Sequence, residues 1–297
     1  MSDLSQEVAP LADEGIYPIR EVSRLTGVNA VTLRAWQRRY GLVQPARTEK
    51  GHRLYSEQDI RQIGEILSWL ERGVSIGQVK GLLSEPHSEP VSDHWQQTLE
   101  QFSQALLAFN QRKAEAELND LLASYPFELV RSRVLQPLVE RLLGLWRERP
   151  DGELLQQVWL GWLHTRFARH LIEQEKGVPV TLASWGQVGP LDLVWAAYEL
   201  IGQGYEVQLL GAVEPRHASL LEGRAATPWL MLLGAGLGKQ ELAAGWPAGT
   251  RLFGDLGRLY DDEWLQAHAW QASLAELMAD VPAAAGASGR GSGRKKS

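Results

Sequence analysis

Apolar residues between positions 16 and 84 recur with the period of short helices, and the first helix is predicted just after Pro18. Ile19, Val22 and Leu25 stand three residues apart, which predicts one apolar helical face. Gly27 follows where a tight turn is needed, because a residue without a Cβ adopts such a backbone conformation most easily. The pattern therefore predicts a short helix that ends in a turn.

A second helix is predicted over residues 29–40. Asn29 can cap its amino end with a side-chain oxygen. Val31 or Leu33, together with Trp36, can face inward, which leaves a polar and cationic outer face made of Thr32, Arg34, Gln37 and Arg38. Two helices joined by a tight turn are typical of a helix-turn-helix, and a cationic second helix suits the major groove of DNA.

A hairpin is predicted beside that helix, over residues 41–56. Gly41 ends the helix, and Lys50 with Gly51 marks a turn between two strands. Cations on this hairpin can straddle backbone phosphates as a wing does. They are Arg47, Lys50, His52 and Arg53.

Helical periodicity then continues almost without interruption to residue 176. Ser56, with Asp59 three residues later, predicts the capped start of a third helix, and residues 74–83 predict a short fourth one. Between 94 and 176 the apolar stripes predict four more helices joined by short turns, which is typical of a bundle. The stripes include Leu99, Phe102, Leu106, Phe109, Val130, Val134, Leu138, Leu142, Leu155, Trp159, Leu163 and Phe167.

From residue 178 the pattern changes to short apolar runs, which predict strands over 178–185, 205–212, 228–236 and 250–256. A helical pattern over 191–204 lies between the first two. Alternation of strand and helix predicts a parallel α/β sheet of the flavodoxin-like kind. The fold class is therefore a multidomain α+β protein: a winged helix-turn-helix, then a helical bundle, then a flavodoxin-like α/β domain.

The expected domain boundaries follow these changes of pattern and composition. A Pro- and Ser-rich stretch reads as a linker, and a low-complexity stretch reads as a tail. The predicted parts are a disordered N-terminus (1–15), the DNA-binding domain (16–84), the linker (85–93), the four-helix bundle (94–176), the α/β domain (177–281) and a disordered basic tail (282–297).

Charge is distributed unevenly along the chain. The formal net charge is −6, but residues 16–55 carry eight Lys and Arg against two Glu. Residues 1–15 contain four acids and no base, and residues 290–297 contain four bases and no acid. A compact basic module on an acidic body predicts one end that binds a polyanion.

The chain contains no Cys, which excludes disulfides, iron–sulfur clusters and thiolate metal sites. The N-terminus is acidic and lacks the apolar core of a signal peptide. No apolar run approaches the ~18 residues of a membrane span. We therefore expect a cytoplasmic protein that does not associate with membranes.

Three strings with fixed spacing make the DNA-binding assignment specific: TLRAWQRRYGL (32–42), GHRLYS (51–56) and RGVSIGQVKGLL (72–83). Together they resemble the MerR family of transcription regulators, and most of all its MlrA-like branch, which has Trp at position 36 and is related to light-responsive cobalamin repressors. The resemblance implies a homodimer that binds promoter DNA with an over-long spacer. It also implies that the promoter is distorted so that RNA polymerase can engage both elements.

The resemblance also implies roles for individual residues. Arg34 should bind a backbone phosphate, Thr32 and Trp36 should lie at the surface of the recognition helix, and Lys50 and Arg53 should serve the wing. Packing in the core is an alternative for Trp36 and is expected for Tyr40, while Arg24 and Arg72 are expected to be solvated. The expected DNA-binding set is Asn29, Thr32, Arg34, Trp36, Gln37, Arg38, Arg39, Arg47, Lys50, His52 and Arg53.

The C-terminal half resembles the cobalamin-binding regions of the same branch but lacks their ligand. An Asp-x-His-x-x-Gly motif after the first strand would supply the cobalt ligand, and the matching stretch 184–195 contains no His. A Glu-His pair expected in the bundle is also missing, since His164 and His170 are six residues apart and do not share a helical face. We therefore expect no cofactor and no metal, and a sensory or partner-binding role for residues 177–281.

The sequence offers only weak signals for other functions. The Gly-rich string 233–238 is expected to be a sharp turn, because Lys239 stands where a phosphate loop of the dinucleotide-binding type would have Gly. No nucleophile–base pattern or paired carboxylates stand out, so an enzyme is not expected. The alternatives are a cobalamin-dependent light-responsive repressor, a cobalamin-dependent transferase fused to a helix-turn-helix, and a regulator controlled by a cyclic dinucleotide or a partner protein.

Overall fold

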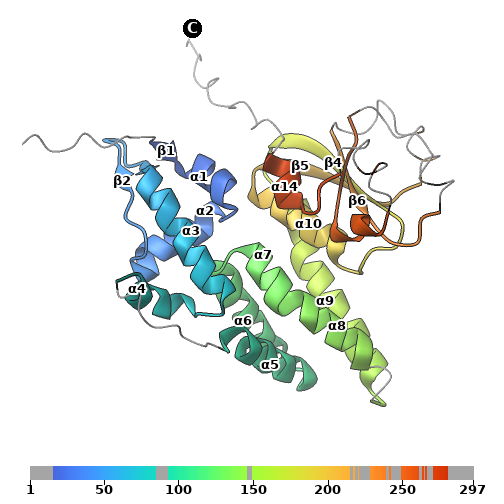
Figure 1. Ribbon diagram of the computed structural model, residues 1–297. Helices are drawn as coiled ribbons and strands as arrows, with labels where there is room; N and C mark the ends of the chain where they lie inside the picture. The colour runs from blue at the N-terminus through green and yellow to red at the C-terminus, as the bar shows by residue number, and fades with distance from the viewer. Residues whose placement is uncertain are drawn as a thin grey trace, which may run out of the picture. The chain divides into compact units, whose positions relative to one another are not determined.

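The computed structural model describes residues 16–84, 93–145, 149–214, 217, 220, 228–238, 241, 249–260, 263, 265 and 270–279. The chain divides into two compact units, residues 1–141 and 142–297, called here the N-terminal and C-terminal units (Figure 1). The predicted N-terminal segment 1–15, the tail 282–297 and nearly all of the linker 85–93 lie outside the described residues. The boundary between the two units, after residue 141, falls inside the predicted four-helix bundle (94–176). That these residues form a single domain stays a prediction.

The first part of the N-terminal unit has the elements of a winged helix-turn-helix. Three short strands form an antiparallel sheet in the order β1-β3-β2. The strands are β1 (Tyr17–Pro18), β2 (Ala46–Arg47) and β3 (Arg53–Tyr55). The helices are α1 (Ile19–Thr26), α2 (Ala30–Ala35), the π-helical turn η1 (Trp36–Tyr40), α3 (Glu57–Glu71) and α4 (Ile76–Ser84).

Local signals in the sequence explain where these helices begin and end. Gly27 ends α1 with φ of 69°, a left-handed conformation that suits glycine. Asn29 accepts a hydrogen bond from the Thr32 backbone N–H at 2.8 Å, which caps α2. Ser56 and Asp59 cap each other's backbone N–H groups at the start of α3, as predicted. The sheet also contains β1, which the sequence pattern did not predict.

The inward face of α2 differs from the prediction in one turn. Val31 is 63% exposed, whereas Thr32 has no exposed surface. The expectation that Thr32 faces outward was therefore wrong. Thr32 and Trp36 are four residues apart and Leu33 and Trp36 three apart, so all three share one helical face. That face packs against the protein, and the β-branched Val31 is turned to solvent.

The helices of the bundle region continue the N-terminal unit. Leu99, Phe102 and Leu106 are buried as the stripe predicts, but Phe109 is 45% exposed because α5 ends before it. The helix after Pro126 contains a π-helical turn and crosses the division between the units. The elements are α5 (His94–Leu107), α6 (Gln111–Ser124), α7 (Phe127–Val130), η2 (Arg131–Leu135) and α8 (Gln136–Leu145).

The C-terminal unit is built on a four-stranded sheet in the order β5-β4-β6-β7, in which all neighbours are parallel. This confirms a parallel α/β region. The strands are β4 (Val178–Trp185), β5 (Tyr205–Ala212), β6 (Trp229–Leu233) and β7 (Arg251–Phe253). The helical elements are α9 (Gly152–Glu173), α10 (Asp192–Gly202), the 3-10 turn η3 (Asp255–Leu259) and α14 (Leu274–Ala279).

Apolar side chains cover both faces of this sheet. On one face α10 and α14 lie together and bury a cluster that includes Leu182, Leu200 and Leu277 (Figure 1). On the other face Trp185 and Trp229 form the centre of a second cluster. These tryptophans are core residues, as expected, because aromatic side chains bury the most apolar area. No helix in the described part of the chain is long and apolar enough to span a membrane.

Candidate nucleic-acid interface

One face of α2 and η1 presents cations to solvent. Arg34 and Arg38 are exposed, lie four residues apart on the same side of the helix, and follow the exposed Val31. Arg39, at the edge of this face, is also exposed. The described residues of α2 and η1 include no acidic side chain, so every charged group on the exposed face is positive. Such a face is suited to a polyanion.

The buried side of the same helix holds two residues that were expected at the DNA surface. Trp36 has no exposed surface, and its indole N–H donates to the Ser124 carbonyl oxygen at 2.8 Å. Thr32 is equally buried. In this conformation neither side chain can touch DNA, so both expectations are corrected. The packing alternative describes Trp36, although its hydrogen bond goes to the end of α6 and not to the wing.

Asn29 and Gln37 hold the recognition helix in place with their side-chain oxygens. Asn29 is occupied as the cap of α2. Gln37 Oε1 accepts a hydrogen bond from Arg53 Nε at 2.7 Å, and this bond joins the helix to the wing. Both residues belonged to the expected contact set, and the structure gives them positioning contacts with the protein. The Arg53 bond to Gln37 uses Nε, one of the several N–H donors of the guanidinium group.

The wing itself is a tight hairpin that carries exposed cations. The Thr48 N–H donates to the His52 carbonyl at 2.9 Å, and the Gly51 N–H donates to the Thr48 carbonyl at 2.8 Å. Gly51 has φ of 82°, which explains why glycine stands at the turn. Lys50 and His52 are exposed at this turn, and Arg47 is exposed on β2.

Tyr55 is a buried residue whose pKa is affected by arginines from both the helix and the wing. Burial raises the pKa of Tyr55, and the positive charges of Arg53 and Arg34 act on the pKa in the opposite direction. Arg34 comes from α2 and Arg53 from β3, so the two guanidinium groups lie near the same buried phenol. The recognition helix and the wing thus each bring one arginine close to the same buried side chain.

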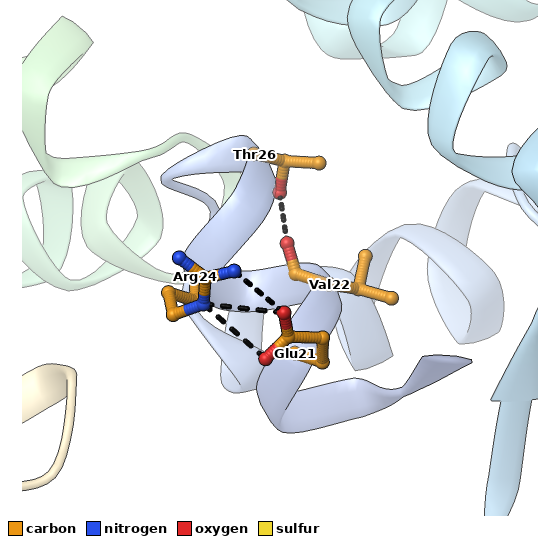
Figure 2. Close-up of polar contacts among 4 residues, drawn as sticks. All are labelled: Glu21, Val22, Arg24 and Thr26. Carbon is orange, nitrogen blue, oxygen red and sulfur yellow. Dashed lines mark hydrogen bonds and ion pairs between the residues drawn. The ribbon is translucent and has the colours of Figure 1, made fainter. Parts of the chain in front are cut away.

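Arg24 is excluded from this surface by an ion pair within α1. Its Nη2 lies 2.7 Å from Glu21 Oε1, and its Nε lies 3.2 Å from both carboxylate oxygens (Figure 2). The hydrogen bonds to Arg24 hold the pKa of the Glu21 carboxyl below its usual range. In the same helix Thr26 Oγ1 donates to the Val22 carbonyl at 2.7 Å (Figure 2). The charge of Arg24 is therefore already compensated.

A joint between the DNA-binding elements and the following helices was not predicted from the sequence. The Tyr125 hydroxyl accepts from the Ile76 N–H at 3.2 Å and lies 2.8 Å from His94 Nε2. Trp95 Nε1 donates to the Leu70 carbonyl at 2.7 Å. Burial raises the pKa of Tyr125 to about 12 and lowers the pKa of His94. At neutral pH Tyr125 therefore keeps its proton and His94 is uncharged, so the hydrogen bond between them joins two neutral groups.

Ser124 extends this joint to the recognition helix. Besides accepting from Trp36, Ser124 lies 3.1 Å from the Tyr40 hydroxyl through its own Oγ. Tyr40 thus packs inside the protein, as expected. The only sequence signal for the joint is the Ser124–Tyr125–Pro126 break between two helical stripes, which resembles an ordinary turn. Its partners lie far away in sequence, so periodicity could not identify them.

In the C-terminal unit, the loops that follow β4 and β6 are joined to each other. The Gln187 N–H donates to the Ala235 carbonyl at 2.9 Å, and the Ala235 N–H donates to the Gln187 carbonyl at 2.8 Å. The Gly234 N–H donates to the Trp185 carbonyl at 2.7 Å. A Cβ added at Gly234 would collide with the Gln187 backbone, so this close approach requires glycine.

The Gly-rich string 233–238 forms a turn whose N–H groups are used within the protein. Besides the two bonds above, the Leu237 N–H donates to the Tyr260 hydroxyl at 3.3 Å, and the Gly238 N–H donates to Glu241 at 2.6 Å. A phosphate loop would need such N–H groups to point at a ligand. The sharp turn expected from the sequence agrees with these contacts.

Within the described residues of the C-terminal unit, the ionisable side chains form no cluster that resembles a metal site. Asp192 accepts from the Gly189 N–H at 2.7 Å and so closes the turn before α10. His170 is stacked on Tyr198, with ring centroids 4.8 Å apart. Among the described residues of the whole chain, no group of three or more His, Asp or Glu side chains could hold a metal ion.

Comparison with known proteins identifies the N-terminal region. The model of the MerR HTH family regulatory protein matches residues 17–86. The HTH-type transcriptional regulator MlrA of Escherichia coli (strain K12) is 31% identical over 217 residues, which cover 72% of this chain and 88% of that protein. MlrA of Salmonella typhimurium (strain SL1344) is 30% identical over the same length.

A more distant relative is the HTH-type transcriptional repressor CarH of Myxococcus xanthus. It is 27% identical over 141 residues, which cover 42% of this chain and 46% of that protein. Among solved structures, a MerR-family regulator from Bacillus cereus covers 51% of this chain with 19% identity and a TM-score of 0.25, which is too low to support an argument. The match to MlrA, which extends over most of both chains, shows that this protein belongs to the MerR family of transcriptional regulators and is MlrA-like.

Proposed function

We propose that this regulator binds promoter DNA sequence-specifically, with α2 and η1 in the major groove and the β2–β3 hairpin on the adjacent phosphates. The observation that carries the proposal is the set of exposed cations on the helix and on the wing. Arg34 and Arg38 on the helix, together with Arg47 and Lys50 on the wing, are all exposed. The Gln37–Arg53 hydrogen bond sets the position of the wing relative to the helix. Cations held at a fixed spacing can contact several phosphates at once.

Arg34→Ala tests this proposal. Loss of one phosphate contact should weaken binding to all duplexes and reduce the slope of log K against log salt by about one unit. The measurement is a gel shift across a salt series, with the duplex enriched by the protein from a random-sequence library. Unchanged affinity and slope would contradict the assignment.

Arg112→Ala is the matched control for that experiment. Arg112 is exposed in the first turn of α6, twelve residues before Ser124, or about 18 Å along the helix axis. The variant removes the same charge from the same unit without touching the proposed surface. It should leave both affinity and salt slope nearly unchanged.

We further infer that the protein works as a homodimer that distorts its promoter for RNA polymerase. One winged module covers few base pairs, and helix-turn-helix proteins usually gain contact length by pairing on two half-sites about 34 Å apart. The family resemblance of the DNA-binding strings supports distortion of the DNA as part of the mechanism. One of these strings, residues 32–42, contains the exposed Arg34.

For the C-terminal unit we propose a sensory or partner-binding role without cobalamin. The chain runs from β4 to β5 on one side and then crosses to β6 on the other side, so the strand order reverses between β4 and β6. Open parallel α/β sheets bind ligands beyond the strand ends at such a switch point. Here the backbones of Gln187 and Ala235 bond to each other across that place. No imidazole stands in residues 184–195, and Asp192 is engaged with Gly189. These residues do not fit the ligand set that the resemblance implies.

A visible spectrum tests this part of the proposal. The full-length protein would be mixed with excess adenosylcobalamin in the dark, desalted, and measured before and after green light. We expect no retained corrin absorbance and no light-dependent change in DNA affinity. Stoichiometric corrin absorbance would support the alternative of a light-responsive repressor instead.

A further inference from the structure

The recognition helix exposes one large apolar side chain on its cationic face. Val31 is 63% exposed in the first turn of α2, and Arg34 and Arg38 follow on the same side. The amino-terminal residues of a recognition helix are those that reach base edges in the major groove. Val31 therefore stands at the end of the helix where bases are read, one turn before the first exposed arginine.

The residues around Val31 at the start of α2 are less available for contact with bases. Thr32 is buried, and the side-chain oxygen of Asn29 is occupied by its cap to the Thr32 N–H. Valine is also a weaker helix former than alanine, and Val31 gains little from packing because most of its surface meets solvent. Contact with a binding partner therefore explains an exposed valine at this position better than a contribution to the stability of the fold.

We propose that Val31 reads thymine by contact with the C5-methyl group, an inference that rests on the proposed DNA-binding function. In the major groove the thymine methyl is the apolar feature that distinguishes one base pair from the others. An isopropyl group on a helix whose other exposed side chains are cationic matches that methyl. Val31 is thus assigned as a specificity residue, whereas the arginines provide affinity that is independent of sequence.

Replacing thymine by uracil tests the contact directly, because uracil lacks only the methyl group. The duplex enriched by the full-length protein from a random 30-bp library would be resynthesised with dU at each dT in turn. One position per half-site should lose about fourfold in affinity, the value of one buried methyl at ~0.8 kcal/mol. Val31→Ala should lose about the same factor on the dT duplex and show no further loss with dU at that position.

Two controls make the outcome decisive. Val31→Ala should fold normally, since its side chain is exposed and alanine favours helix, and a thermal melt checks this. Leu107→Ala, which truncates an exposed apolar residue at the end of α5, should leave the dU profile unchanged. A Val31→Ala profile identical to that of the parent, or a uniform loss on every duplex, would overturn the inference while leaving DNA binding intact. Failure to enrich any duplex would contradict the proposed function itself.

Discussion

Gln37 carries no charge, but it positions a charged residue of the wing, Arg53. The 2.7 Å bond from Arg53 Nε to Gln37 Oε1 uses one guanidinium donor to fix the wing. Charge-assisted hydrogen bonds of this kind are stronger than neutral ones, which suits a positioning contact. Residues that bear no charge can therefore affect DNA affinity without taking part in the salt dependence.

Gln37→Ala should lower DNA affinity, because the wing loses its tie to the recognition helix. We expect a loss of at most about ten- to 150-fold, because one hydrogen bond to a charged group contributes about 1.5–3 kcal/mol. The salt slope should stay unchanged because no cation is removed. A gel shift across a salt series separates this result from that of Arg34→Ala. Gln58→Ala, at an exposed position in α3, is the control, and a changed slope for Gln37→Ala would contradict a positioning role.

His94 makes the stability of the N-terminal unit depend on pH. Burial lowers its folded pKa below the ordinary value, so the folded state holds His94 neutral where the unfolded chain would protonate it. Its contribution is present above the unfolded pKa of about 6.5 and is lost as pH falls through the lower folded pKa.

The variant His94→Gln tests whether His94 causes the loss of stability at low pH, because glutamine does not titrate in this range. Between pH 7.5 and pH 5.5 the free energy of unfolding should fall more for the parent protein than for the variant. Urea unfolding of the full-length chain at each pH provides the values. Parallel pH dependence of the two proteins would show that His94 does not contribute.

At the scale of elements, the turn between α6 and α7 organises the N-terminal unit. Tyr125 contacts the start of α4 through Ile76 and the start of α5 through His94. Ser124, one residue earlier, contacts the recognition helix through Trp36. A short turn thus connects the DNA-binding elements to the helices that follow them.

Tyr125→Phe should destabilise the protein by about 1–3 kcal/mol. Tyr125 is 5% exposed, and its loss would leave the Ile76 N–H without its acceptor. Tyr40→Phe removes a hydroxyl from the same joint but leaves only the Ser124 hydroxyl to find another partner, so its cost should be smaller. Urea unfolding measures both. Equal effects of the two variants would argue against a central role for Tyr125.

At the scale of the whole molecule, charge and size both bear on assembly. The basic residues 16–55 contrast with a chain whose formal net charge is −6, so DNA should attract one part of the molecule and repel the rest. This favours binding in one orientation. Two copies related by two-fold symmetry would present two recognition helices to successive major grooves.

Light scattering should therefore give a mass near twice 33.1 kDa for the free protein. The complex with the enriched duplex should contain two chains per duplex. The duplex itself should contain two related half-sites, about one helical turn apart between centres. A mass of one chain, with one chain per duplex, would refute the homodimer and leave the basic surface of each module unaffected.

The sequence by itself determined those features that depend on neighbouring residues. The cap at Ser56 and Asp59, the turn at Gly27 and the parallel strands after residue 178 agree with the structure, because each is encoded within a few positions. The strings of the DNA-binding module were specific enough to identify the MerR family. Positions of the exposed arginines on α2 also followed from helical spacing alone.

Only the tertiary structure decided that Thr32 and Trp36 lie on the buried side of that helix and Val31 on the exposed side. Trp36 is buried because its partner is Ser124, 88 residues further along the chain, and helical period carries no information about so distant a contact. Once Trp36 points inward, geometry places Thr32 beside it and turns Val31 outward. The joining of Gln187 to Ala235 was likewise invisible, since it needs two strands to become neighbours first. The polarity of its residues suggested which face of the recognition helix is exposed, but packing against residues far away in the sequence determined that face.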